Sequence, residues 1–408
     1  MGDRWATVGP SGRRVRSRMA GWLRAVSVST AVGLAVAGCT SASSSPASQK
    51  AAGPHLDFVQ RDGTHFTVAG NVWRFVGYNL PCANPFLMTS DQLGHYLDVV
   101  QQDSGANAIR MWFFQTNGGP GNWAPFDRVL AQVKAHGMRI VATLTNEWNG
   151  GCDAGAANTQ KTLDWYQSGY KSPEVGHALS FRDYAAQVAS RYANDPNIAM
   201  WQLVNEAQAN TADASGSLRC DNAAGATALR AFSDDMAGVI KAVDHNHPVG
   251  LGTNGGSPCG VATSAAFQQV HDGALDMCEY HDYGASAAAM PGGPDFLAQR
   301  IHDCATLPHG GKPLFVGESG IQGNVQPNGG PPACTPWPSC SPFQVLPDTI
   351  DRRAALFAAK MKAALDAGVA GYLIWVKSPY YSTTDDIYAI GDGDPTENAM
   401  KSSGFATQ

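Results

Sequence analysis

The stretch IAMWQLVNEAQ, residues 198–208, begins as a buried β-strand and ends in polar side chains. Apolar residues predominate up to Val204, and the amide of Asn205 and the carboxylate of Glu206 follow directly. A strand that runs into a polar loop has the same pattern. A functional site is the alternative, because a charge next to an apolar core is costly unless it is paired. The rest of the sequence decides between these two interpretations.

Seven further apolar runs alternate with longer segments of helical periodicity, which is typical of a parallel sheet. The eight predicted strands cover residues 73–79, 108–112, 139–144, 198–204, 248–252, 277–281, 313–318 and 371–375. Helical spacing is clearest in residues 181–192, 229–240 and 357–365. This pattern predicts an α/β fold, a (β/α)8 TIM barrel. Alternating residues around Asp62 and Gly63 predict an N-terminal β-hairpin that closes the barrel floor. A doubly wound sheet is the competing fold, but no GxGxxG follows the first strand.

Residues 1–39 have the pattern of a lipoprotein-type signal peptide. Arginines precede the weakly apolar run VSVSTAVGLAVAG, which is too short to span a bilayer as a permanent helix. Residues 36–39, VAGC, look like a bacterial lipobox, so we expect lipidation at Cys39. A plain secretory signal with a chance cysteine is the alternative. Arg13 and Arg14 leave twin-arginine export open beside the Sec route.

The predicted domain organisation is a flexible Ser/Ala/Pro tether over residues 40–55 and one catalytic barrel over residues 56–408. Residues 1–38 hold six Arg and one Asp, so their removal takes the formal net charge from −6 to −11. An acidic chain of this kind argues against nucleic acid as a main partner. We expect a monomer outside the cytoplasm, either secreted or held at the bacterial cell membrane only through its lipid anchor.

Eight cysteines follow Cys39, an even number that predicts up to four disulfides in an exported chain. None is in a CxxC pair, so a zinc or thioredoxin-like site is not expected. Their connectivity cannot be deduced, although Cys334 and Cys340 bracket a short Pro-rich loop. The acidic residues of 385–394 lack the spacing of an EF-hand. We therefore predict no metal and no cofactor.

Polar and aromatic residues gather at the predicted carboxyl ends of the strands, where a barrel of this kind builds its active site. Two are carboxylates, Glu206 after the fourth strand and Glu318 at the seventh. The others are Asn79, Arg110, Trp112, Asn146, Trp148, Asn205, His281, Tyr283 and Trp375. Each alone has a structural explanation, such as a barrel ion pair for Arg110. Their concentration on one face favours a functional site.

Two carboxyl groups on one rim suit the cleavage of a glycosidic bond. One carboxylic acid protonates the leaving oxygen, and a second carboxylate acts at the anomeric carbon. A separation of roughly 5 to 5.5 Å gives retention of configuration, and a wider one gives inversion. Because the acid needs a raised pKa and the nucleophile a low one, we expect their environments to differ.

The motifs IRMWFF, TLTNEWN, WQLVNEAQ, EYHDYG, FVGESG and GYLIWVKS, in this order, resemble the clan of retaining (β/α)8 glycosidases that includes the family 5 glycoside hydrolases. The resemblance covers residues 56–376 and is greatest to the β-mannanase and cellulase branch. It implies that Glu206 is the acid/base and Glu318 the nucleophile. It further implies roles in substrate binding or in holding Glu318 for Asn205, Arg110, His281, Tyr283, Trp375, Asn146, Trp148 and Trp112.

Two residues depart from the β-mannanase pattern. Glu147 stands where these relatives often carry an amide, and it either binds a substrate hydroxyl or faces solvent; we favour solvent. Ser319 follows the nucleophile where an apolar or aromatic residue is more usual. Aromatic residues in the long loops 145–179 and 319–349 either stack on sugar rings or pack within the protein.

The predicted function is a retaining endo-acting hydrolase of a β-1,4-linked polysaccharide or oligosaccharide, an endo-β-1,4-mannanase. The alternative is a β-1,4-glucanase or an exo-β-glycosidase of the same clan. A serine esterase fails on spacing, because Ile321 stands where the final Gly of GxSxG is needed. A non-catalytic glycan-binding lipoprotein is the remote alternative, and the presence of both carboxylates argues against it.

Overall fold

The computed structural model describes residues 57–81, 88–148, 160–213, 216–283, 297–324, 348–377 and 388–406. The chain divides into two compact units, Met1–Ala51 and Ala52–Gln408, and every described residue belongs to the second. The predicted signal peptide, Cys39 and the tether therefore lie outside the described residues.

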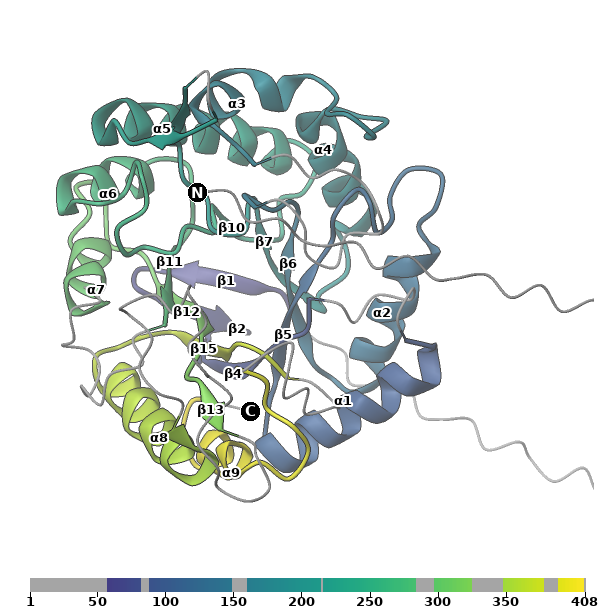
Figure 1. The fold of residues 1–408 in the computed structure, drawn as a ribbon. Coiled ribbons are helices and arrows are strands. Elements are labelled where there is room, and N and C mark those ends of the chain that lie inside the picture. The colour runs from purple at the N-terminus through teal and green to yellow at the C-terminus, as the bar shows by residue number, and fades with distance from the viewer. Residues whose placement is uncertain are drawn as a thin grey trace, which may run out of the picture. The chain divides into compact units, whose positions relative to one another are not determined.

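Eight parallel strands form the central sheet, in the order β10-β7-β6-β5-β4-β15-β12-β11. Their bounds are β4 Phe75–Asn79, β5 Ala108–Trp112, β6 Arg139–Thr143, β7 Ile198–Gln202, β10 Val249–Gly250, β11 Cys278–Asp282, β12 Leu314–Ser319 and β15 Gly371–Ile374. Each one overlaps a predicted strand. The helices surround these strands in Figure 1. The predicted (β/α)8 barrel is confirmed.

The two outer strands of this order, β10 and β11, meet and close the barrel. No ladder pairs them within the described residues, but two backbone hydrogen bonds join their segments. The N–H of Asp276 donates to the carbonyl of Val249 at 2.8 Å, and the N–H of His281 donates to the carbonyl of Asn254 at 2.9 Å. β7 and β12 are thus separated by β10 and β11 on the shorter way round the barrel.

The helices have the bounds α1 Ser90–Ser104, α2 Ala124–Ala135, α3 Leu163–Gln167, α4 Phe181–Tyr192, α5 Asn222–Lys241, α6 Ser264–His271, α7 Leu297–Ala305, α8 Ile350–Asp366 and α9 Pro395–Lys401, with a 3-10 turn at Gly169–Lys171. The predicted helix over 181–192 begins after Ser180, whose hydroxyl accepts from the N–H of Asp183. None of the helices in the described ranges has the length and apolar character that a membrane span requires.

The barrel floor is closed by an antiparallel sheet of β1 (Val59–Asp62), β2 (His65–Val68) and β3 (Asn71–Trp73). The predicted hairpin at Gly63 is confirmed, and β3 adds a third strand. Phe66 and Trp73 are buried and lie 6.3 and 4.9 Å, between ring centroids, from Phe75 at the start of β4. This cluster fills the end of the barrel opposite the strand tips, so the tips alone are left to form a site.

Among the described residues, four shorter strands lie outside the barrel sheet and the floor, and two disulfides are present. The strands are β8 Thr211–Ala212, β9 Leu218–Arg219, β13 Gly323–Asn324 and β14 Asp348–Thr349. Cys220 is bonded to Cys259, and Cys278 of β11 to Cys304 of α7. The other four cysteines of the predicted set, including Cys334 and Cys340, lie outside the described residues. The two bonds are typical of a chain that folds in an oxidising compartment.

Candidate active site

Glu206 lies beyond the tip of β7 in a strained backbone conformation. Its φ is +56°, a region that side chains other than Gly rarely occupy. Asn205, the residue before it, forms a parallel bridge with Asn146 beyond β6. On the other side Gly252 fits against the chain, since a Cβ there would lie 1.9 Å from the carbonyl oxygen of Val204. Packing on both sides thus fixes a conformation of the kind that is stored at functional sites.

Glu318 is the second carboxylate and is buried at the end of β12. Arg110 Nη1 donates to Oε1 at 2.6 Å, and the hydroxyl of Tyr283 donates to Oε2 at 2.6 Å. His281 Nδ1 lies 3.5 Å from Oε2. Three side chains from two segments, β5 and the end of β11, thus hold one carboxylate.

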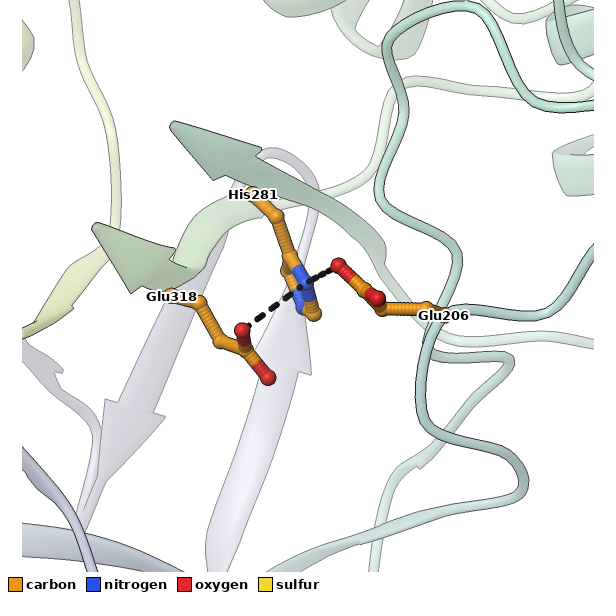
Figure 2. A group of neighbouring side chains, drawn as sticks. All are labelled: Glu206, His281 and Glu318. Carbon is orange, nitrogen blue, oxygen red and sulfur yellow. Dashed lines mark hydrogen bonds and ion pairs between the residues drawn. The ribbon is translucent and has the colours of Figure 1, made fainter. Parts of the chain in front are cut away.

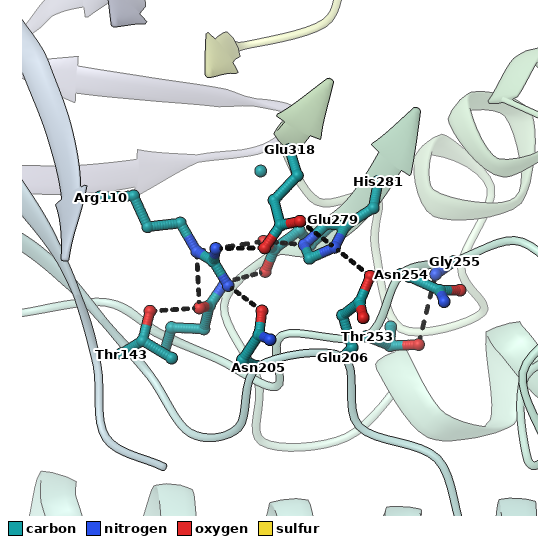
Figure 3. A network of polar contacts seen from close by, with 12 residues as sticks. Arg110, Thr143, Asn205, Glu206, Thr253, Asn254, Gly255, Glu279, His281 and Glu318 are labelled. Atoms are coloured by element: carbon teal, nitrogen blue, oxygen red, sulfur yellow. Dashed lines mark hydrogen bonds and ion pairs between the residues drawn. The ribbon is translucent and has the colours of Figure 1, made fainter. Parts of the chain in front are cut away.

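Arg110, on β5, links this carboxylate to its neighbours. Its side chain is fully buried. Besides Glu318, it donates to Asn79 Oδ1 at 2.8 Å, to Gln202 Oε1 at 2.9 Å and to Asn205 Oδ1 at 2.6 Å. Figure 3 shows the guanidinium between Glu318 and Asn205. These four hydrogen bonds use four of the five N–H groups of the planar guanidinium, so it fixes the relative positions of the side chains around it.

Glu206 faces Glu318 across His281, as Figure 2 shows. His281 Nδ1 lies 3.0 Å from Glu206 Oε1, and the indole N–H of Trp148 donates to Oε2 at 2.6 Å. One carboxylate oxygen of each Glu and a ring nitrogen of His281 all lie within 4.8 Å of one another. The side chain of Glu206 is 18% exposed and that of Glu318 is 4% exposed, so solvent reaches the first carboxylate and not the second.

The pKa values of the two carboxyl groups are ordered opposite to the prediction. Burial by itself raises the pKa of Glu206, but the hydrogen bond and charge of His281, with the indole N–H of Trp148, outweigh it and lower the pKa. Burial raises the pKa of Glu318, although the charges of His281 and Arg110 oppose it. The predicted order is wrong for this arrangement because both strong donors beside Glu206 favour its ionised form.

His281 is the cation between the two carboxylates. Burial alone lowers the pKa of an imidazole, but the charge of Glu318 and the hydrogen bonds to Glu206 and Glu279 raise it to about 10. The ring is therefore an imidazolium at neutral pH.

Aromatic rings line the site beside Arg110. Trp112 lies under the guanidinium, 4.7 Å from ring centroid to Cζ, and stacks on Phe114 with centroids 5.1 Å apart. Trp375, after β15, is 6.1 Å from Trp112 between centroids, and a cis peptide bond follows it. Trp148 is 39% exposed. The side chain of Asn146 accepts a hydrogen bond from Asn205 at 2.9 Å. The residues predicted at the strand ends thus all lie at this one site.

One prediction about a polar residue near the site is wrong, and an open alternative for three aromatic residues is decided. Glu147 does not face solvent: it is fully buried, accepts a 2.7 Å hydrogen bond from Tyr166, and has its pKa raised by burial to about 9. For Trp165, Tyr166 and Tyr170, which are in the loop 145–179, the alternative of packing within the protein is confirmed, because all three are buried against Phe232 of α5. Their helical spacing within 163–170 is the signal of core packing. Trp337 lies outside the described residues.

Glu279 was not predicted as a site residue. It is buried in the barrel interior, and His281 Nε2 lies 3.1 Å from its Oε1. The sequence contains a signal for it: side chains two residues apart on a strand point to the same face, and Glu279 is two residues before the predicted site residue His281.

Among the described residues, Glu206, His281 and Glu318 are the one group with spacing that suits a metal ion. Arg110 and Tyr283 both donate to Glu318, and a guanidinium at this distance disfavours a second cation. The donor set fits a hydrogen-bonded acid/base cluster better than a metal centre.

A close carboxylate pair at the carboxyl rim of a (β/α)8 barrel, walled by aromatic rings, defines the class of glycoside hydrolases. The family model of cellulases, glycosyl hydrolase family 5, matches residues 68–334. The chain belongs to glycosyl hydrolase family 5.

Relatives and solved structures agree with this family. A probable mannan endo-1,4-beta-mannosidase C of Aspergillus terreus is 27% identical over 49% of this chain and 55% of its own length. A putative mannan endo-1,4-beta-mannosidase 9 of Oryza sativa is 27% identical over 48% and 51%. The chain thus spans about half the length of these curated relatives.

Two solved structures share the fold. An endo-1,4-beta-mannanase of Rhizomucor miehei matches with a TM-score of 0.60 and 17% identity over 86% of this chain and 98% of its own. A beta-glucanase of Saccharophagus degradans matches with a TM-score of 0.56 and 17% identity over 86% and 94%.

Proposed function

We propose that this chain is a retaining endo-β-1,4-mannanase, with Glu318 as nucleophile and Glu206 as acid/base. The observation that carries the proposal is the separation of the two carboxylates, whose nearest oxygens lie within 4.8 Å. This is close to the roughly 5 to 5.5 Å of retaining enzymes and leaves no room for the water that inversion requires.

In the proposed reaction Glu318 attacks the anomeric carbon while Glu206 protonates the leaving oxygen. The glycosidic bond breaks as the ester to Glu318 forms. Glu206 then removes a proton from water, which displaces Glu318 and restores both groups. Ester formation removes the negative charge of Glu318, so the pKa of Glu206 falls when it must act as a base. Arg110 and Tyr283 hold the nucleophile in place by donating to its two oxygens.

The sugar is proposed to lie between Asn205 and the aromatic rings. The amide of Asn205 is oriented at both ends, by Arg110 and by Asn146, and it would contact the 2-hydroxyl. Trp375 and Trp112 offer flat apolar faces for a sugar ring, with Trp148 and His281 on the side of Glu206.

Mannan is proposed as substrate because the curated relatives reported above are named mannan endo-1,4-beta-mannosidases. A β-1,4-glucanase is the second candidate, favoured by the fold of the Saccharophagus beta-glucanase. Exo action is the other alternative of the same clan.

The test is hydrolysis of mannan, glucomannan, cellulose, xylan and mixed-linkage glucan by the wild type, Glu206→Ala and Glu318→Ala. We expect a ladder of oligosaccharides from mannan, first released with the β configuration. Each variant should lose roughly 10²- to 10⁴-fold or more in rate. Asp303→Asn is the matched control, since this buried carboxylate pairs with Arg300 on α7. Release of α-anomer first, or full activity in either Ala variant, contradicts the proposal.

We also propose that the mature chain is a monomer anchored outside the cytoplasm by a lipid on Cys39, followed by the tether. The two disulfides support an oxidising compartment. Labelling with a radioactive fatty acid should mark the wild type and not Cys39→Ser. Equal labelling of both, or of neither, contradicts the lipid anchor.

A further inference from the structure

A third carboxylate lies inside the barrel, one layer below the proposed catalytic pair. Glu279, on β11, is 2% exposed. Its Oε1 lies 3.1 Å from His281 Nε2 and 4.0 Å from Arg110 Nε, and its Oε2 accepts a short hydrogen bond from the amide of Gln202. Figure 3 shows Glu279 behind the ring of His281. The mechanism above gives this group no task.

The neighbouring strand is shaped around Glu279. Gly317, the residue before the proposed nucleophile, has no side chain, and a Cβ there would lie 1.8 Å from Glu279 Oε1. Any larger residue at 317 would push the carboxylate away from His281. The glycine next to Glu318 therefore makes room for Glu279.

His281 has a carboxylate at each ring nitrogen. Nε2 lies 3.1 Å from Glu279 and Nδ1 lies 3.0 Å from Glu206. A neutral imidazole has one N–H, so it can donate to only one of two ionised carboxylates, whereas the imidazolium donates to both. Glu279 thus orients the ring and favours its charged form, in which Nδ1–H is directed at Glu206.

The charges that face Glu279 come from every side of the cluster. Arg110 on β5 and His281 on β11 contact Glu279 directly, and Glu206 after β7 and Glu318 on β12 lie beyond them; Gln202 on β7 and Tyr283 after β11 are neutral donors. Two cations meet three carboxylates, so the fully ionised cluster is negative and one bound proton makes it neutral. Without Glu279, two cations balance two carboxylates and an added proton is unfavourable in a buried site.

We propose that Glu279 is a positioning residue for the proposed hydrolysis: through His281 it fixes the charge of the buried cluster so that one proton remains available to Glu206. The inference rests on the proposed function. Because Glu279 acts through His281, its removal changes the pH at which the acid is protonated as well as the geometry.

The test compares the pH dependence of kcat/KM for the wild type, Glu279→Gln and the control Asp303→Asn. Gln has the same shape as Glu and can still accept from His281, so it removes the charge; its NH2 group then faces the donor Gln202, so the hydrogen bond from Gln202 is lost as well. We expect the alkaline limb of Glu279→Gln to move down by about one pH unit or more, because a charge within 4–6 Å shifts a pKa by roughly 1 to 3 units. Asp303→Asn should keep the wild-type limb. An unmoved limb in Glu279→Gln overturns the proposal.

A second measurement follows the ring nitrogens of His281 by NMR, assigned by comparison with His281→Gln. The wild-type ring should stay protonated beyond about pH 8, well above the ordinary pKa of roughly 6.5. In Glu279→Gln the ring should titrate at least about one unit lower. Wild-type titration near the ordinary value, or equal pKa values in the two proteins, overturns the proposal.

These readouts separate the two levels of inference. If the wild type cleaves no polysaccharide, the proposed function fails, and the NMR titration still decides whether Glu279 sets the charge of His281. If Glu279→Gln does not fold, the same two measurements are made on Gly317→Ala, because a Cβ there would lie 1.8 Å from Glu279 Oε1 and push this carboxylate away from His281; an unmoved alkaline limb and an unmoved ring pKa overturn the proposal.

Discussion

Removal of the indole N–H of Trp148 is expected to raise the pKa of Glu206 and to widen the pH range of activity on the alkaline side. The indole donates to Glu206 Oε2 at 2.6 Å. It therefore stabilises the ionised carboxylate and not the acid. Trp148→Phe keeps an aromatic ring and deletes the donor.

The magnitude follows from the exposure of the pair. A hydrogen bond to a charged group contributes roughly 1.5 to 3 kcal/mol when buried. Trp148 is 39% exposed and the side chain of Glu206 is 18% exposed, so water replaces part of what is lost. We therefore expect loss of this hydrogen bond to destabilise the ionised carboxylate by about 1 kcal/mol. At 1.36 kcal/mol per pKa unit, this raises the pKa of Glu206 by about 0.7 unit.

The assay is the pH profile of kcat/KM on the polysaccharide that the wild type cleaves best. Loss of ring contacts with substrate changes the height of this profile, whereas the pKa change moves its alkaline limb upward. Trp123→Phe is the control, because Trp123 packs against Tyr192 and Arg191 instead. An alkaline limb that stays in place or moves down in Trp148→Phe refutes the reasoning.

Three further predictions concern stability. Burial raises the pKa of Glu147 in the folded protein to about 9, so folding favours its neutral form. The contribution of this group to stability is therefore fully present below its unfolded pKa, where the acid is neutral in both states, and it is lost as the pH rises toward 9. Glu147→Gln, which resembles the neutral acid, should therefore raise the free energy of unfolding at pH 7 by about 2–3 kcal/mol; denaturant unfolding that shows it unchanged or lower contradicts this. Replacing Cys278 and Cys304 together by Ser opens a loop with a sequence separation of 26 and should lower the free energy of unfolding by about 3.5 kcal/mol; urea titration of the two proteins checks it, and equal midpoints count against it. Gly252→Ala places a Cβ 1.9 Å from the carbonyl of Val204 at a φ of +91°, so a drop in melting temperature of several degrees is expected, and an unchanged value would show that the β7 and β10 tips separate easily.

The sequence predicts the barrel and its rim well because both depend on local patterns. Strand 108–112 is predicted with the bounds that the structure has, since it is a short buried run between helical segments. Asn205 and Glu206 stand out because they break the apolar run of their strand at its end, which in a parallel barrel also fixes their position in space.

Other features depend on contacts between distant segments and escape prediction. Glu147 follows a polar Asn, and only the docking of Tyr166 from α3 buries it. The order of the pKa values of Glu206 and Glu318 depends on the indole of Trp148, which follows β6, and the ring of His281 on β11, because both reach Glu206 from distant segments. Glu279 is polar inside a strand and not at its tip, so a search of strand ends passes it by.

The meeting of β10 and β11 has a consequence for local opening. Two backbone hydrogen bonds hold this part of the barrel, and the amide of His281 makes one of them. Each of the two segments carries one of the described disulfides. Cys278 of β11 is bonded to Cys304 of α7. Cys259, which follows β10, is bonded to Cys220, directly before the N-cap residue of α5. Sub-global opening between these strands would carry the imidazolium away from Glu206, while His281 stays beside Glu318 on the paired strand β12. The covalent cross-links therefore anchor both segments that meet here, and hydrogen exchange at the amides of Asp276 and His281 reports directly on how often Glu206 and His281 separate.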